Sequence, residues 1–105
     1  TNSERRVQRI RASLQPAGET KPVWEIVKEL ATNMGSTEFN YSNASSVFDD
    51  IAKNVETYTG LSYERLDSEF TGVQWPVPDS EHPGTPTLHS DKFSTASGLA
   101  RVTTI

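Results

Sequence analysis

The 105-residue sequence contains no cysteine. This absence excludes disulfides, thiolate zinc sites and cysteine-bound iron–sulfur clusters within the chain. The sequence also has no run of 18 apolar residues, so we expect no membrane span in this stretch. The N-terminus lacks the apolar region of a signal peptide, and the cellular location stays open with the cytoplasm favoured.

Hydrophobic residues are scarce, at 33% of the chain, which predicts a small core. The chain is still not of disordered type, because it has nine aromatic residues and a net charge of only -4. Its charge is uneven: residues 1–28 hold six basic and three acidic side chains, whereas the remaining residues hold four basic and eleven acidic ones. The acidic part would repel nucleic acid, so we expect no nucleic-acid partner.

Residues 22–34 form the clearest predicted helix. Thr20 is a candidate N-cap, Pro22 suits the first turn and Gly35 suits the position after the C-cap. One face is apolar at the i, i+3, i+4 spacing of a helix. That face consists of Val23, Trp24, Val27, Leu30, Ala31 and Met34.

A second helix is predicted at about 44–58, with Ser42 or Asn43 as its cap and Gly60 after its end. A short third helix at about 62–69 would begin at Ser62. The side chains predicted to pack from it are Tyr63, Leu66 and Phe70. The two long helices have apolar stripes that would allow them to pack as an antiparallel pair.

Residues 73–98, hereafter the proline loop, contain four prolines and two glycines, which no helix tolerates at this spacing. We expect an extended loop here, a short strand at 99–105, and extended or irregular chain over 1–20. The predicted fold class is therefore an α-rich α+β segment. A long loop in so short a chain indicates that it lies against something outside this sequence.

No motif for catalysis or for nucleotide binding is complete, and we assign no catalytic and no metal-binding residue. His82 and His89 lie in the proline loop at a spacing that matches no common zinc pattern, which favours hydrogen bonding to the loop backbone or to a neighbouring domain. Arg5 and Arg6 suit either a bound carboxylate or phosphate, or an ordinary ion pair. The residues alone leave these two alternatives open.

Three stretches carry a resemblance to a known family. The first is Thr1-Asn2-Ser3-Glu4-Arg5-Arg6-Val7-Gln8-Arg9, and the second contains Trp24-Glu25-Ile26-Val27. The third is Val73-Gln74-Trp75-Pro76-Val77-Pro78, followed by His82-Pro83-Gly84-Thr85-Pro86. In this order and spacing, the chain resembles an internal segment of the catalytic (alpha) subunit of molybdopterin-dependent formate dehydrogenases, which belong to the molybdopterin oxidoreductase family.

The resemblance implies a parent that oxidises formate to carbon dioxide at a bis-molybdopterin guanine dinucleotide cofactor with molybdenum or tungsten, together with an iron–sulfur cluster. The cofactor ligands would lie outside this chain. Its partners would be the rest of the catalytic subunit and, through that subunit, electron-transfer subunits. The resemblance divides the chain into a cofactor-side strand or loop (1–20), a helical part (21–72) and an extended loop (73–105). It also implies a cofactor contact for Asn2, Glu4 and Arg5, with a structural ion pair as the alternative.

Two other functions remain as alternatives. One is a segment of a nitrate reductase or of another molybdopterin oxidoreductase, and the other is a stand-alone, non-catalytic helical module that binds a partner protein. A segment is expected to leave Trp75, Leu88 and Phe93 poorly covered, because their covering surface would be absent. A self-contained module would instead bury the proline loop against its own helices.

Overall fold

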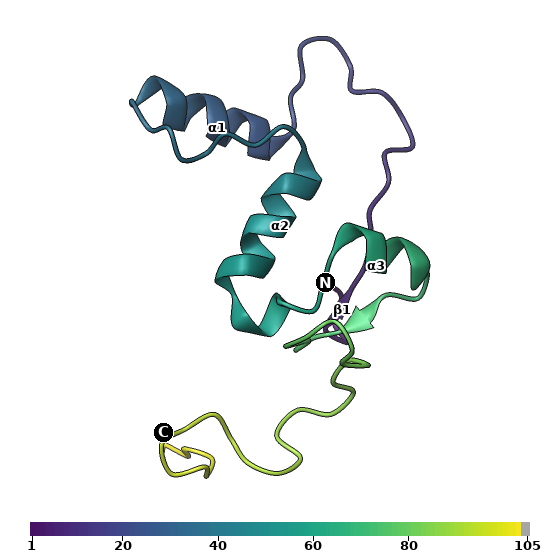
Figure 1. Ribbon diagram of the computed structural model, residues 1–105, viewed down its shortest axis with the longest axis vertical. Helices are drawn as coiled ribbons and strands as arrows, with labels where there is room; N and C mark the ends of the chain where they lie inside the picture. Colours follow the sequence, from purple (N-terminus) through teal and green to yellow (C-terminus); the bar gives the residue numbers. More distant parts are fainter. Residues whose placement is uncertain (104–105) are drawn as a thin grey trace.

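The computed structural model describes residues 1–103, which form three α-helices, one 3₁₀ helix and a two-stranded sheet (Figure 1). In chain order the elements are β1 (Arg6–Val7), α1 (Val23–Asn33), α2 (Ala44–Asn54), η1 (Glu56–Tyr58), α3 (Tyr63–Ser68) and β2 (Val73–Gln74). This content confirms the predicted α-rich α+β class.

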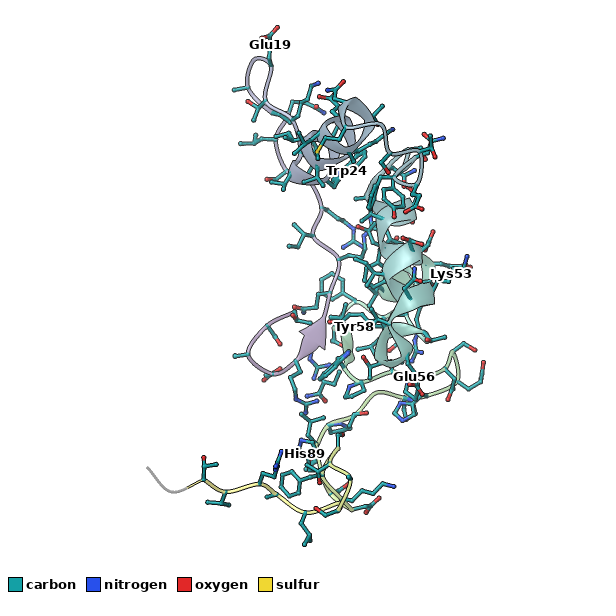
Figure 2. All side chains as sticks on the ribbon, turned by 90° about the vertical axis from the view of Figure 1, so that its left-hand side faces the viewer. Glu19, Trp24, Lys53, Glu56, Tyr58 and His89 are labelled. Atoms are coloured by element: carbon teal, nitrogen blue, oxygen red, sulfur yellow. The ribbon has the colours of Figure 1, made fainter. Side chains whose placement is uncertain are left out.

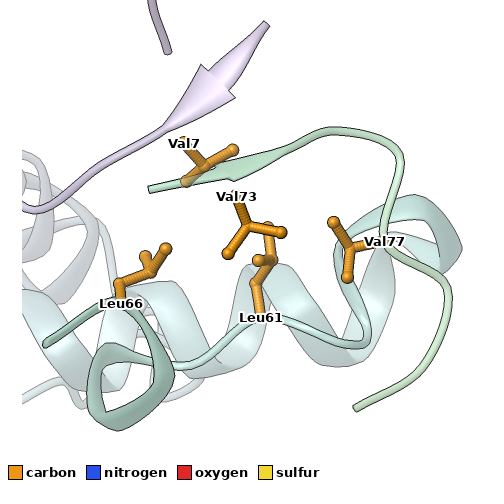
Figure 3. Close-up of a cluster of buried hydrophobic side chains, with 5 residues drawn as sticks. All are labelled: Val7, Leu61, Leu66, Val73 and Val77. Carbon is orange, nitrogen blue, oxygen red and sulfur yellow. The ribbon is translucent and has the colours of Figure 1, made fainter. Parts of the chain in front are cut away.

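The core lies where the N-terminal strand meets the start of the proline loop. Strands β1 and β2 pair antiparallel, with Arg6 opposite Gln74 and Val7 opposite Val73. Five buried side chains gather on this sheet and under α3 (Figure 3). They are Val7, Leu61, Leu66, Val73 and Val77. The core therefore joins the N-terminal strand to residues 61–77 rather than joining the two long helices.

Trp75 packs against this core together with Phe48 and Tyr58. Its indole N–H donates to the hydroxyl of Thr57 at 2.9 Å, and its ring lies 6.1 Å from the ring of Tyr58. The prediction that Trp75 is poorly covered is therefore wrong. The partner was missed because η1, which carries Thr57 and Tyr58, replaces the last turn of the predicted second helix.

Helix α1 confirms the predicted helix at 22–34 to within a residue at each end. Gly35 adopts a positive φ of 88°, and its N–H bonds to the carbonyl of Thr32 while that of Ser36 bonds to Ala31. This is the Schellman motif expected after a helix. The predicted cap at Thr20 is wrong: Pro22 occupies the N-cap position, and the Thr20 hydroxyl donates instead to the carbonyl of Ala17.

The two long helices do not form the expected antiparallel pair. Helix α1 lies across one end of α2 and buries none of its residues (Figure 1). Leu30 is 58% exposed and Met34 is 78% exposed. The connection of residues 34–43 turns the chain so that only the first half of the α1 stripe, which includes Trp24, comes near α2.

Helix α2 is shorter than predicted. It begins with a capping box in which Asn43 accepts from the N–H of Ser46, and the Ser46 hydroxyl accepts from the N–H of Asn43. It ends before Val55, which is extended with φ -118° and ψ 101°. The periodic apolar pattern continues through this residue into η1, so the sequence alone gave no sign of the break.

Helix α3 confirms the third predicted helix and its cap. The Ser62 hydroxyl accepts from the N–H of Arg65 at 3.1 Å, and Leu66 is buried. Phe70 was predicted to pack from this helix but is 87% exposed. The helix ends at Ser68, and the turn through Gly72, whose φ is +74°, directs the chain into β2 and leaves Phe70 outside the core.

The proline loop has two parts with different environments. Its inner part, residues 73–86, includes β2 and packs on β1 and α3, whereas its outer part, residues 87–98, extends away from them together with residues 99–103 (Figure 1). Leu88 is half-buried and Phe93 is 40% exposed, so among the three side chains expected to be poorly covered only Phe93 is exposed. The strand predicted at 99–105 is wrong for residues 99–103, which have no strand pairing, and 104–105 lie outside the described residues.

The chain is elongated for its length. Its radius of gyration is 17.6 Å and its extents are 50 × 34 × 29 Å, whereas a compact domain of this size has a radius of gyration of about 13 Å. Figure 2 shows Glu19 and His89 at opposite ends of the molecule, with Tyr58 between them. Only the middle of the molecule is therefore built around a core.

Candidate functional site

The turn at residues 2–6 brings the three predicted cofactor-side residues together. The side-chain oxygen of Asn2 accepts from the N–H of Glu4 at 3.0 Å and from that of Arg6 at 2.9 Å. The main-chain groups of Asn2 and Arg6 also bond to each other, at 3.1 Å. Arg5 adopts a left-handed conformation with φ 60°. An Asn side chain that folds back on its own backbone is a common means of closing such a turn.

The guanidinium of Arg5 is used within the chain itself. It donates to the carbonyl oxygens of Trp75, of Thr85 at 3.1 Å and of Pro86 at 2.9 Å. Charged hydrogen bonds of this kind are stronger than neutral ones. Arg5 therefore attaches the N-terminal turn to both ends of the packed part of the proline loop, and its partners are main-chain oxygens rather than a carboxylate.

The side chain of Glu4 does not bond to the backbone as those of Asn2 and Arg5 do; its carboxylate contacts one charged group. The Nε atom of Arg6 lies 3.5 Å from it, and the Glu4 side chain is 63% exposed. Arg6 also donates to the carbonyl of Gly72 at 3.1 Å. The structure thus places Asn2, Glu4 and Arg5 in one turn, and their contact with a cofactor stays a prediction.

A shallow hollow of about 260 Å³ lies beside this turn, lined by Thr1, Asn2, Arg5, Tyr58 and Trp75. Its volume is below the range of sites that enclose a drug-sized ligand, so it has room for one ring or one phosphate rather than a dinucleotide. Among residues 1–103, no group of three metal-ligating side chains is close enough to hold a metal ion. The hollow beside the N-terminal turn is therefore too small for a complete metal–pterin cofactor.

Arg65 was not singled out from the sequence, yet it forms the most extensive set of polar contacts in the core region. Its side chain is 15% exposed and donates to the carbonyls of Gly60 (2.9 Å), Ser80 (2.9 Å) and His82 (2.7 Å). Its Nε atom pairs with Glu69 at 2.8 Å. A single arginine on a short helix carries no sequence signal for this role, because all its loop partners are main-chain atoms.

The two histidines lie in different surroundings. The Nδ1 atom of His82 accepts from the N–H of Gly84 at 3.1 Å, which confirms the predicted bonding to the loop backbone. His89 stacks on Phe93 with ring centroids 4.6 Å apart. The structure does not bring the two rings into one site.

Two titratable groups near α1 have shifted pKa values. The hydroxyl of Tyr41 donates to Asp50 at 2.5 Å, and this hydrogen bond raises the pKa of the Tyr41 phenol. A hydrogen bond to Glu29 likewise raises the pKa of Lys21. The Lys21–Glu29 pair is exposed and the Tyr41–Asp50 pair is half-buried, and neither lies at the N-terminal turn.

Among residues 1–103 no helix is long and apolar enough to cross a membrane.

Comparison with known proteins identifies the relatives of this segment. No family model matches the chain. It is 47% identical, over its whole length, to "F420-dependent formate dehydrogenase 2 subunit alpha" of Methanococcus maripaludis, and covers 15% of that protein. It is 42% identical over 97% of its length to "F420-dependent formate dehydrogenase subunit alpha" of Methanocaldococcus jannaschii, again covering 15%. A "Putative formate dehydrogenase" of Staphylococcus haemolyticus is 45% identical over 97% of the chain, which covers 10% of it.

These matches confirm the resemblance that the three sequence stretches carry. The chain spans about 15% or less of the length of these curated relatives. By sequence, the chain is a relative of the formate dehydrogenase alpha subunits and corresponds along its whole length to a short part of them.

Proposed function

We propose that this chain is a segment of the catalytic subunit of an oxidoreductase that converts formate to carbon dioxide, releasing an electron pair and a proton. One observation carries the proposal: relatives at 42–47% identity over nearly the whole chain bear the name formate dehydrogenase. These names favour formate over nitrate as the substrate of the parent.

The segment itself would be structural. The polar atoms of Asn2 and Arg5 are directed at the chain's own backbone, and Arg65 likewise bonds to main-chain oxygens of the proline loop. No step of the reaction is assigned to these residues. A molybdenum or tungsten pterin cofactor would be held by other parts of the polypeptide, with this segment maintaining the shape of one wall near it.

The alternative of a stand-alone helical module is less well supported. Helix α1 has no buried residue, and large apolar side chains such as Leu30 and Met34 lie open on it. A self-contained module would cover this face, because an isolated 11-residue helix is barely stable in water. The inner part of the proline loop does pack on the chain's own core, so the loop by itself does not separate the two functions.

The test is made on the native polypeptide that carries this sequence. We expect its mass to be several times that of this chain, its metal analysis to show molybdenum or tungsten, and its activity to be formate-dependent reduction of an artificial dye. Acetate in place of formate serves as the control substrate. If the polypeptide instead oxidises a reduced dye with nitrate and shows no activity with formate, the segment belongs to a nitrate reductase. A metal-free native chain of about this size would contradict the proposal.

A further inference from the structure

An apolar groove lies between α1, the connection that follows it and α2. It has a volume of about 360 Å³, and the side chains that form its apolar lining are Trp24, Val27, Phe39, Tyr41, Val47 and Ile51. The exposed stripe of α1 continues the groove outward through Leu30 and Met34. We refer to the groove and this stripe together as the α1 surface.

The α1 surface needs a permanent cover. Helix α1 has only 11 residues and buries none of them, and helices of this length are marginal in water without tertiary packing. Its main-chain end is closed by the Schellman motif at Gly35, but that motif leaves the apolar side chains open. When a transiently bound partner dissociates, helix α1 would lose the packing that keeps it folded.

The charges of the α1 surface also indicate an obligate contact. Its two charged lining residues are both bonded within the chain: Lys28 donates to the carbonyl of Tyr41 at 2.6 Å, and Asp50 accepts from the Tyr41 hydroxyl. A patch without uncompensated charge at its centre resembles a domain core that has been divided, as in permanent interfaces. Residues 21–54, which contain this surface, hold three lysines and five acidic residues, so its surroundings are acidic.

We infer that the α1 surface is covered by an apolar face, edged with basic side chains, that belongs to the same polypeptide. This inference rests on the proposed function. The curated relatives have about 85% or more of their length beyond the part that matches this chain, which provides the covering segment in one molecule. An internal cover is permanent by construction, as the short helix requires, whereas a separate subunit or a second copy would dissociate on dilution.

The test measures hydrogen exchange in the purified catalytic polypeptide, alone and dilute enough to be monomeric by analytical ultracentrifugation. We expect the amides of α1 to be protected at least about 100-fold relative to a free peptide, as for packed helices. Exchange at free-peptide rates, or protection that is present only in a dimer or only after another subunit is added, would overturn the inference.

Two substitutions make the test specific to the groove. Val27→Asp and Ile51→Asp place a charge in its lining, and Asn33→Asp adds the same charge at the exposed end of α1. We expect the first two to reduce α1 protection by 10-fold or more and the control to leave it nearly unchanged. Equal effects of all three would contradict an internal cover.

The outcome is separable from that of the proposed function. Protection of α1 in a monomeric polypeptide that lacks formate activity would retain the cover and remove the substrate assignment. Formate activity in a polypeptide whose α1 amides are unprotected would retain the substrate assignment and remove the internal cover.

Discussion

Arg5 and Arg65 lie far apart in the sequence, yet both donate hydrogen bonds to main-chain carbonyl oxygens of the proline loop. Arg5 binds near the two ends of its packed part (residues 73–86), at Trp75 and Pro86, and Arg65 binds between them, at Ser80 and His82. After β2, the described part of this loop has no helix or strand to satisfy its carbonyls. The conformation of the packed part of the proline loop therefore depends on both guanidinium groups.

Replacing Arg65 with lysine keeps the charge but removes the planar group that reaches several oxygens at once. A lysine ammonium cannot replace the contacts to Gly60, Ser80 and His82 together, so we expect Arg65→Lys to lower the free energy of unfolding by about 2 kcal/mol. The measurement is urea unfolding of the native polypeptide. Arg101→Lys, at an exposed position, is the matched control. Equal urea midpoints for both variants would show that the loop does not need Arg65.

Arg5→Lys separates the structural function of the N-terminal turn from cofactor contact. If Arg5 acts on the loop carbonyls, the variant has a lower thermal midpoint, while its metal and pterin content per folded molecule is unchanged. Glu4→Gln, which changes an exposed carboxylate in the same turn, should leave both quantities unchanged. Loss of pterin from the Arg5 variant at an unaltered thermal midpoint would instead support a cofactor contact.

Gly60→Ala tests the close approach of η1 and the proline loop. The N–H of Gly60 bonds to the carbonyl of Val77 at 2.8 Å, and an added methyl group would fall on the main-chain carbonyl of Asp79. Because both neighbours are backbone atoms, we expect a loss of about 3 kcal/mol in stability. Gly18→Ala meets no atom within 4 Å and carries only the strain of its φ of 59°, for which about 1 kcal/mol is expected. Thermal unfolding that ranks the two variants in the opposite order would contradict this packing.

The hydrogen bond between Trp75 and Thr57 connects the proline loop to η1. Trp75→Phe removes the donor and Thr57→Val removes the acceptor, and each should cost about 1 kcal/mol. A double-mutant cycle should show that the two losses are not additive, because either change alone already removes the bond. Strict additivity in urea unfolding would mean that the bond does not contribute to stability.

The Tyr41–Asp50 pair predicts a dependence of stability on high pH. The hydrogen bond to Asp50 raises the pKa of the Tyr41 phenol above its ordinary value of 10.0. A pKa that is higher in the folded state means that the stabilisation is fully present below pH 10.0 and is lost as the pH rises through the folded pKa. Asp50→Asn should return the phenol toward its ordinary pKa, as read from phenolate absorbance. An unchanged titration would contradict the assignment.

Local signals in the sequence were sufficient for most helix boundaries, with the end of α2 as the exception. The apolar spacing of 22–34, the cap at Ser62 and the glycine after α1 each depend on residues within a few positions, and the structure confirms all three. The N-terminal motif drew attention to Asn2, Glu4 and Arg5, but the turn that they form was not predicted from the sequence. The sequence could not decide the role of Arg5, because its partners Trp75, Thr85 and Pro86 are distant in the sequence.

The sequence by itself determined where the helices begin and end to within a few residues, and it identified the relatives of the chain. Tertiary structure alone decided which apolar side chains are covered. Val73 and Val77 of a proline-rich stretch became the most buried residues, while the periodic stripe of α1 stayed open. The physical reason is that periodicity reports which side of a helix is apolar, whereas burial requires a second surface. For the proline loop that surface is Val7 and Leu66, which only folding brings to it.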